Sequence, residues 1–278
     1  MTIRHWTNHL SRVFGKFANT AFPGPVQRCV NSAYTSLMDV DLSEFDTAGS
    51  YKTLNALFTR ELVKKRAFDG SAETFIAPAD SLITEQGGLE RDRLLQIKGM
   101  DYSMRDLLTE AAGHVDDMLD GDFVNFYLSP RDYHRYHAPA AFDLRKLIHV
   151  PGRLYPVNMP SLKKRKNLFV TNERVILECG HDAGSVFYLA FIAATNVGDM
   201  LFECEPRVET NTNSVSVSVY EYEAKRINKG DCLGCFKMGS SVVMVLQKDF
   251  LELRTTLNQK VRFGDIVGQV RNGTTLDR

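Results

Sequence analysis

The chain has 278 residues, 44% of them hydrophobic, which is enough to bury a substantial core. Its 34 basic and 34 acidic side chains cancel, so the overall charge gives no support to a nucleic-acid-binding role. Five irregularly spaced cysteines argue against a disulfide scaffold, and no apolar run reaches the ~18 residues that a transmembrane helix needs. Arg12, Lys16 and Asn19 interrupt the apolar N-terminal residues, so we expect no secretory leader, a reducing cytoplasm and only peripheral membrane contact.

The N-terminal fifth of the chain predicts helices. Residues 1–37 contain no Asp or Glu, and their basic side chains are Arg4, Arg12, Lys16 and Arg28. Along a first helix, apolar residues recur at helical spacing and form one stripe: Trp6, Leu10, Val13, Phe14 and Phe17. Pro25 suits the first turn of a second helix, and the apolar face of that helix carries Val26, Cys29, Val30, Ala33 and Leu37.

Further along, helices give way to strands. The pattern predicts a third helix over 54–63 and a fourth over 103–112, which Ser103 would cap. Short β-rich runs follow from about Phe75, and examples are 123–128, 144–150, 186–194, 215–222, 242–246 and 260–270. Because strands and helices do not alternate, we expect an α+β fold in which N-terminal amphipathic helices precede a β-rich, mostly antiparallel, sandwich- or barrel-like core. Residues 1–65 would form a helical membrane-associating region and residues 66–278 a β-rich catalytic domain.

Two histidines stand close together in the segment from Tyr127 to His137. This segment follows a predicted strand and begins with a Ser-Pro turn, so His134 and His137 can serve one site. A polar loop with satisfied side chains is the alternative. Further metal ligands at suitable spacing are missing from the segment, so we expect no metal there.

A second candidate is Gly239-Ser240, directly before a hydrophobic run. The pair could be an ordinary turn. Alternatively, a glycine without a side chain lets a hydroxyl approach its carbonyl closely. A third candidate is Asp80, which follows Ala-Pro-Ala. It could form an Asx-turn, or it could orient a histidine that acts as a base.

The pair Cys232 and Cys235 has the spacing of half a zinc site. Cys179, His181 or Cys204 would have to complete such a site. Only one pair with this spacing exists and its flanks read as a strand, so we expect neither a metal nor a redox role.

Taken together, the motifs resemble the bacterial, pyruvoyl-dependent phosphatidylserine decarboxylase family (prokaryotic type I). Six segments occur in the family's order: 77–80; 95–99 with 102–103; 127–137; 150–154 with 157–158; 168–175; and 229–230 with Gly234 and 236–241. The resemblance runs from about Thr53 to Val270. The first 40 or so residues share only their general character with the family and none of its motifs. Met238 and Ser241 replace the family's usual Leu and Thr around Gly-Ser, and Ser81 stands where Gly is common.

The resemblance implies an activity and roles for these residues. A proenzyme would cut itself between Gly239 and Ser240 into a β chain (1–239) and an α chain (240–278). Ser240 would become a pyruvoyl group, which forms a Schiff base with phosphatidylserine and yields phosphatidylethanolamine and carbon dioxide. Asp80, His137 and Ser240 would form the charge relay for cleavage. His134 would donate the proton in decarboxylation, with His137 as the alternative.

The implied partners are phosphatidylserine in an anionic membrane and the two chains of one precursor, which would form a heterodimer; further dimerisation is left open. We expect a peripheral location on the cytoplasmic face of the cell membrane. Trp6, Phe14 and Phe17 would enter the headgroup boundary while the nearby basic residues meet anionic lipid, unless this helix packs on the β core instead. The basic run 163–166, in a predicted loop after Pro160, would hold headgroup phosphate or be a solvated charge run.

Two other functions are compatible with the sequence. One is a pyruvoyl decarboxylase that acts on a soluble amino acid. The other is a non-catalytic lipid-binding β-domain protein, because residues 260–270 resemble lipoyl-type domains. The basic amphipathic N-terminus favours a lipid substrate over a soluble one. The joint presence of Asp80, His137, Gly239 and Ser240 argues against a protein without activity.

Overall fold

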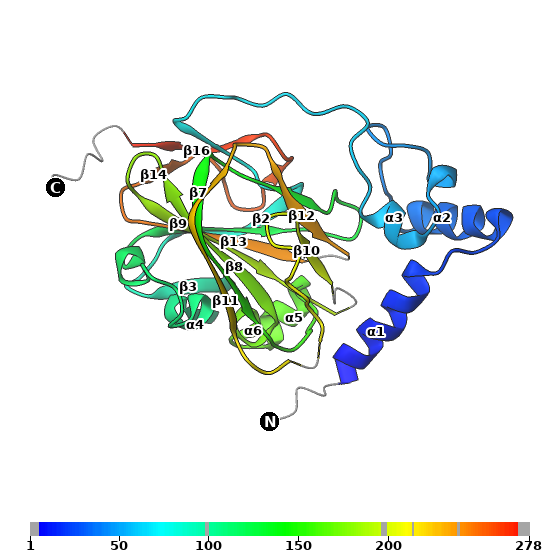
Figure 1. The fold of residues 1–278 in the computed structure, drawn as a ribbon, viewed down its shortest axis with the longest axis horizontal. Helices are drawn as coiled ribbons and strands as arrows, with labels where there is room; N and C mark the ends of the chain where they lie inside the picture. The colour runs from blue at the N-terminus through cyan, green and yellow to red at the C-terminus, as the bar shows by residue number, and fades with distance from the viewer. Residues whose placement is uncertain (1–5, 98–99, 196–198, 213, 238–239, 272–278) are drawn as a thin grey trace.

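The structure, a computed structural model, describes residues 6–97, 100–195, 199–212, 214–237 and 240–271. Three helices come first and extend to one side of a β-rich core (Figure 1). They are α1 (Trp6–Asn19), α2 (Gly24–Met38) and α3 (Leu54–Phe58). Three further short helices lie on the core: α4 (Met104–Leu108), α5 (Met159–Lys164) and α6 (Leu168–Thr171). The predicted boundary between residues 65 and 66 lies in the connection from α3 to the first strand, and it stays a prediction.

The three N-terminal helices pack on one another. Ala18 of α1 joins Leu54 and Leu57 of α3 in a small apolar cluster of their own. Asn31 of α2 is fully buried and donates to the carbonyl oxygens of Ala48 (2.8 Å) and Tyr51 (3.0 Å). These bonds hold the irregular segment between α2 and α3 against α2, because a buried amide must find acceptors. The segment that leads to α3 is therefore fixed from the helical side.

Strands make up the remainder of the core. The first eight are β1 (Thr74–Ile76), β2 (Ser81–Gly88), β3 (Arg93–Ile97), β4 (Met100–Ser103), β5 (Asp122–Tyr127), β6 (Arg135–His137), β7 (Phe142–Val150) and β8 (Arg174–His181). The last eight are β9 (Val186–Ile192), β10 (Met200–Phe202), β11 (Ser218–Ile227), β12 (Cys232–Phe236), β13 (Ser241–Leu246), β14 (Leu251–Leu253), β15 (Lys260–Val261) and β16 (Ile266–Val270).

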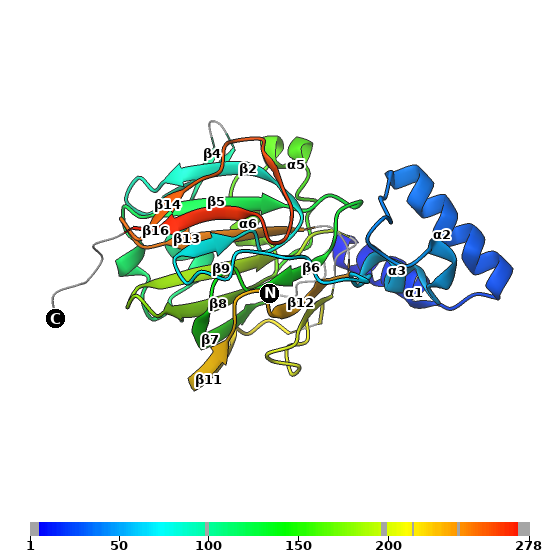
Figure 2. The ribbon, with the colours of Figure 1, turned by 90° about the horizontal axis from the view of Figure 1, so that it is seen from above.

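Eight of these strands form one sheet in the order β11-β7-β8-β9-β13-β5-β2-β15, with every neighbouring pair antiparallel. All residues of β9 and β13 are buried, so both faces of the sheet are covered at its centre. Smaller sheets, β1-β16-β14 and β10-β12-β6, lie against it (Figure 2). The expectation of an α+β, mostly antiparallel fold is confirmed. Among the described strands the sheet does not close into a barrel.

Several predicted elements differ in extent from the observed ones. The third helix ends at Phe58 rather than Val63, because the chain turns at Thr59 and Val63 then donates to the carbonyl of Glu44. The fourth starts where expected, with the Ser103 hydroxyl accepting from the Asp106 amide, but ends at Leu108. The predicted strand over 260–270 is two strands, β15 and β16, and Gly264 between them has φ +101°.

The expected loop around the basic run 163–166 is wrong in its first half. Lys163 and Lys164 belong to α5, which continues from Met159. Asn158 starts this helix because its side-chain oxygen accepts a hydrogen bond from the Ser161 amide at 3.1 Å. Both lysines lie in the last turn, where a helix favours positive charge.

Candidate active site

His134 lies in the connection that leads from β5 to β6, and Ser240 lies directly before β13. β5 and β13 are neighbours in the large sheet, while β6 and β12 are neighbours in the small sheet (Figure 2). Leu128 donates its amide to the Ser240 carbonyl (2.9 Å), and Phe236 donates its amide to the His134 carbonyl (2.9 Å). The histidine segment and Ser240 are therefore held at the same corner of the core.

Ser240 is fully buried, directly before β13. Its hydroxyl donates to the carbonyl of Ile192, the last residue of β9. No hydrogen bond among the described residues joins this hydroxyl to His134 or His137. Gly239, the other half of the expected cleavage site, lies outside the described residues.

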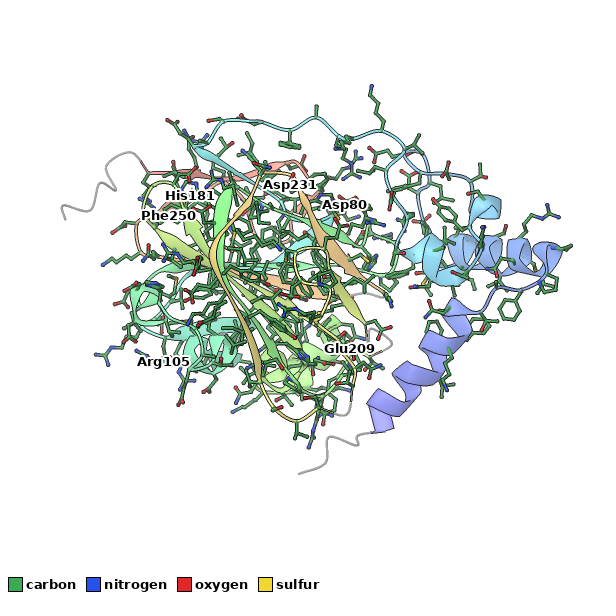
Figure 3. The ribbon with its side chains drawn as sticks, in the orientation of Figure 1. Asp80, Arg105, His181, Glu209, Asp231 and Phe250 are labelled. Carbon is green, nitrogen blue, oxygen red and sulfur yellow. The ribbon has the colours of Figure 1, made fainter. Side chains whose placement is uncertain are left out.

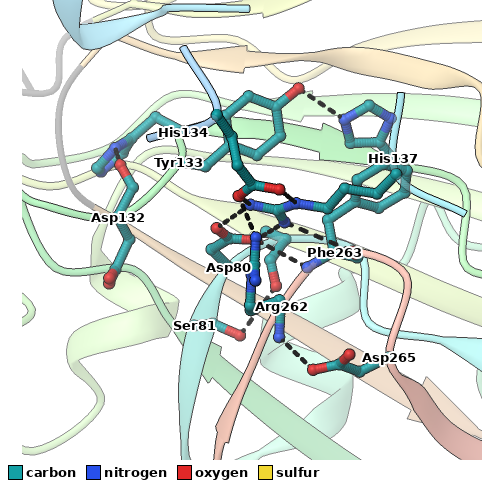
Figure 4. Close-up of polar contacts among 12 residues, drawn as sticks. Asp80, Ser81, Asp132, Tyr133, His134, His137, Arg262, Phe263 and Asp265 are labelled. Carbon is teal, nitrogen blue, oxygen red and sulfur yellow. Dashed lines mark hydrogen bonds and ion pairs between the residues drawn. The ribbon is translucent and has the colours of Figure 1, made fainter. Parts of the chain in front are cut away.

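His137 is held by hydrogen bonds at both ring nitrogens, and Figure 4 shows the one to Tyr133. Nδ1 lies 3.0 Å from the Gly230 carbonyl, which can only accept, so Nδ1 carries the proton. Nε2 therefore accepts from the Tyr133 hydroxyl at 3.0 Å. The imidazole also stacks on the Phe263 ring, with centroids 3.7 Å apart. Burial lowers the pKa of His137 to about 4, so the ring is neutral at pH 7.

Gly230 is needed where it stands. Its φ is +80°, and a Cβ at this position would come within 2.2 Å of the Phe68 ring. Its own amide donates to the Ala138 carbonyl at 2.9 Å, next to His137. Only glycine combines this conformation with so close an approach, so the acceptor for His137 Nδ1 is fixed by backbone geometry.

Asp80 lies between β1 and β2, on the side of the core that faces the helices (Figure 3). Arg66 donates to both of its carboxylate oxygens, at 2.5 and 2.9 Å, and the Phe263 amide donates to it at 2.7 Å. A direct hydrogen bond to His137, which the charge relay led us to expect, is absent among the described contacts of Asp80. The two residues are joined through Phe263, whose backbone binds Asp80 and whose ring stacks on His137.

His134 is completely buried. Its Nδ1 donates to the Asp132 carbonyl at 2.8 Å, while Nε2 has no hydrogen-bond partner among the described residues. The ring of Phe58, from the end of α3, lies against it with centroids 3.9 Å apart. Burial, and secondly the nearby Arg60, lower the pKa of His134 to about 3. The imidazole is therefore neutral, with an unused lone pair on Nε2.

A cavity of about 410 Å³ opens beside this cluster, between the segment that precedes the core and the core itself. Asp80 and Tyr133 belong to its wall, and so do Phe45 and Arg60 from the helical side. The cavity thus reaches the residues that hold His137 without including either histidine in its lining.

The part of the chain that the structure describes contains no cluster of three His, Cys, Asp or Glu side chains suited to a metal ion. Cys232 and Cys235 both lie on β12, as the flanking pattern predicts, and burial raises the pKa of each thiol. A raised pKa disfavours the thiolate that metal binding or redox exchange requires. Within the same described ranges, no helix is both long and apolar enough to cross a membrane.

Sequence reasoning missed several residues of this site. Tyr133 lies inside the motif that directed attention to His134 and His137, but its spacing gave no sign that it meets His137. Arg66 sits in a short basic run that reads as solvent-exposed charge, and Phe263 reads as an ordinary core residue. The positive φ of Gly230 could be suspected from its place in a Lys-Gly-Asp turn.

Comparison with known proteins shows which family the chain belongs to. A sequence model of the phosphatidylserine decarboxylase family matches residues 54–269. A phosphatidylserine decarboxylase proenzyme of Helicobacter pylori (strain J99) is 42% identical over 266 residues, covering 95% of this chain and 97% of the relative. Proteins of the same name from Campylobacter jejuni and Idiomarina loihiensis are 38% and 32% identical, covering 92% and 94% of this chain and 96% and 92% of each relative. The chain therefore belongs to the phosphatidylserine decarboxylase family, a family of carboxy-lyases.

Proposed function

We propose that this chain is a proenzyme that cuts itself at Gly239–Ser240 and then converts phosphatidylserine to phosphatidylethanolamine and carbon dioxide. Family membership supports the reaction class, and the similar proteins of Helicobacter and Campylobacter are named as proenzymes. One observation carries the proposal: the chain segment that contains His134 and His137 is hydrogen-bonded to the segment that leads to Ser240. The Leu128 amide donates to the Ser240 carbonyl, and the Phe236 amide donates to the His134 carbonyl.

Self-cleavage would begin at the Ser240 hydroxyl. Its oxygen attacks the Gly239 carbonyl carbon, the peptide C–N bond breaks, and an ester links Gly239 to the Ser240 side chain. Removal of the α-proton of residue 240 then breaks the Cβ–O bond and frees a chain that ends in the Gly239 carboxylate. The dehydroalanine that remains takes up water and loses ammonia, leaving a pyruvoyl group at position 240. No outside oxidant or reductant is required.

His137 is the proposed base for this step. It is neutral, and its Nδ1 proton is directed at Gly230, so Nε2 is the nitrogen that can accept a proton. In the described state Tyr133 donates to Nε2 and Ser240 donates to Ile192, so both hydroxyls must turn before the proton can pass. Asp80 would support His137 through Phe263 and the ion pair with Arg66 rather than by direct contact.

The surroundings of position 240 suit a pyruvoyl group. Two buried polar atoms on adjoining segments, the hydroxyl oxygen of Ser241 and Nε2 of His134, lack partners in the described chain. The Ser241 hydroxyl can donate to an oxygen of such a group, and the lone pair of His134 Nε2 can accept from the substrate ammonium. The group would supply an electrophilic carbonyl for the substrate amine and a sink for the electrons left when carbon dioxide departs. Neutral His134 would take the proton that the substrate ammonium must lose, and return it to the α-carbon.

A lipid substrate requires contact with a bilayer, and the N-terminal helices are proposed to make it. Val13 and Phe17 of α1 are 53% and 44% exposed, and Leu37 at the end of α2 is 81% exposed. Phe14 instead packs against the cluster of Ala18, Leu54 and Leu57, so it serves the contact with α3. The exposed apolar side chains and the absence of acidic residues up to Leu37 favour a peripheral position on an anionic, cytoplasmic membrane face.

Intact-mass measurement together with carbon dioxide release from phosphatidylserine vesicles tests the function. The wild-type protein should appear as two chains, the smaller beginning with a pyruvoyl group, and it should release carbon dioxide. Ser240→Ala should remain one chain of 31.4 kDa and be inactive. Ser185→Ala is the matched control, since Ser185 is, like Ser240, a buried serine directly before a strand, but that strand is β9. A wild-type chain that stays whole, or a cleaved one that acts only on free amino acids, would refute the proposal.

A further inference from the structure

Arg60 is a buried cation that pairs with no carboxylate in the part of the chain that the structure describes. It follows α3 and is 2% exposed, and its Nε and Nη1 have no hydrogen-bond partner among the described residues. Only Nη2 is used, as a donor to the carbonyl oxygens of Arg131 (2.9 Å) and Asp132 (3.2 Å). Burying a charge without a counterion is costly, so such a guanidinium calls for an anion in some state of the protein.

The cavity that Arg60 lines contains both signs of charge, but most of its charges are already paired. The paired cations are Arg66, which binds Glu44 and Asp80, Arg262, which binds Glu44, and Arg131, which binds Asp39. Asp132 accepts from the amide and hydroxyl of Ser129. Two further charged residues line the cavity, Asp41 and Lys260. Asp41 accepts from the Ser43 amide. Among the described cations of this wall, Arg60 is the buried one with unused N–H donors.

An apolar ring covers the guanidinium in the described state. The Phe45 ring lies over Arg60, 4.5 Å from ring centroid to guanidinium carbon, and it lines the same cavity. Phe45 is only partly buried and belongs to the irregular segment between α2 and α3. A shift of this ring would open the unused N–H groups of Arg60 to the cavity.

Arg60 also lies next to the proposed proton donor. The Asp132 carbonyl accepts both from Arg60 Nη2 and from His134 Nδ1, at 3.2 and 2.8 Å. An anion held by Arg60 would therefore lie close to the group that exchanges a proton with the substrate's α-carbon. In phosphatidylserine the phosphodiester is separated from that carbon by only the β-carbon and one oxygen.

We propose that Arg60 and the cavity beside it form the subsite for the phosphodiester of the lipid substrate, an inference that rests on the proposed decarboxylase function. The substrate offers two anions, and the chemistry favours the phosphodiester. A guanidinium bound to the carboxylate would stabilise the charge that decarboxylation removes, and so would raise the barrier. The phosphodiester keeps its charge throughout, so a fixed arginine can hold it without opposing the reaction.

A pair of substrates tests the kinetic side. Short-chain phosphatidylserine carries the phosphodiester, whereas O-acyl-L-serine keeps the amine and carboxylate but lacks it. For the cleaved enzyme, Arg60→Gln should reduce kcat/KM for phosphatidylserine about 10- to 100-fold, mainly through KM, and change O-acylserine turnover less than about twofold. Arg60→Lys should fall between. Arg131→Gln is the control, because Arg131 lines the same cavity but is already paired with Asp39. An equal loss on both substrates would overturn the proposal.

Binding gives a readout independent of turnover. The uncut Ser240→Ala chain should bind glycerophosphoserine in a calorimetric titration, and adding Arg60→Gln should weaken that binding by the same 10- to 100-fold. Titration with inorganic phosphate shows whether the phosphate alone is recognised, and titration with serine shows whether the carboxylate is. Binding of glycerophosphoserine that does not depend on Arg60, or serine binding that does, would contradict the assignment. If the wild-type enzyme does not decarboxylate phosphatidylserine, the proposed function itself fails.

Discussion

Arg60 and His134 donate to one shared acceptor, the carbonyl oxygen of Asp132. This arrangement fixes the His134 proton on Nδ1, since a carbonyl cannot donate. Burial, and secondly the positive charge of Arg60 beside the imidazole, lower the pKa of His134. The ring is thus neutral, and the lone pair on Nε2 is the place where it can take up a proton.

The two histidines should separate cleavage from turnover. His134→Ala should leave self-cleavage mostly intact and reduce decarboxylation by about 10²- to 10⁴-fold, because it removes the acid–base group at the substrate. His137→Ala should block cleavage and leave one chain. Gel analysis and carbon dioxide release measure the two steps. His114→Ala, in a half-buried position after α4 and far along the chain from both histidines, is the control. Equal failure of both steps in both variants would show that the division of roles is wrong.

Tyr133→Phe should alter the pH profile of self-cleavage. The Tyr133 hydroxyl donates to Nε2, a bond that only the neutral form of His137 can accept. We therefore expect this bond to add to the burial that lowers the pKa of His137. Removing the hydroxyl while keeping the ring should raise this pKa. The acidic limb of the cleavage-rate profile should then move to higher pH. The measurement is the cleavage rate of freshly refolded precursor at each pH, and an unchanged profile would rule out this role for Tyr133.

Stability should decrease in mild acid. The pKa values of His134 and His137 are lowered from 6.5 to about 3 and about 4, so only the unfolded chain binds these protons between pH 6.5 and 4. Each such proton lowers the free energy of unfolding by about 1.4 kcal/mol per pH unit as the pH falls through this window. Urea denaturation of the Ser240→Ala chain at several pH values measures the slope. His134→Gln or His137→Gln should flatten it, and parallel slopes would contradict the prediction.

Membrane binding should depend on the exposed apolar face of α1. Replacing Val13 and Phe17 together by Ser should reduce binding to anionic vesicles at least about tenfold, because each side chain would no longer bury apolar area in the bilayer. Self-cleavage should continue. The matched control replaces Val219 and Leu257, which are also exposed apolar residues but lie on the β core. Equal binding by the two double variants in vesicle sedimentation would refute the proposed membrane face.

Much of the fold was accessible from the sequence because local patterns decide it. The Ser103 cap, the proline at the start of α2 and the buried run of β13 all follow from local chemistry. β8 is buried along nearly its whole length and shows no alternation, and its strand character was missed. The contacts within the site were not accessible, because the pairing of Asp80 with Arg66 and of His137 with Tyr133 depends on how distant segments meet.

The position of β13 has a consequence for how the mature protein arises. This strand lies between β5 and β9, and β15 and β16 from the same C-terminal segment pair with β2 and β1. After a cut before Ser240, strands of the fragment 240–278 would therefore remain paired with strands of the fragment 1–239. The smaller fragment could not leave without unfolding these sheets. Folding would then have to come before the proposed cut, and fragments 1–239 and 240–278 made separately should not reconstitute the protein on mixing. Maturation would then be a one-way event, performed once by each molecule.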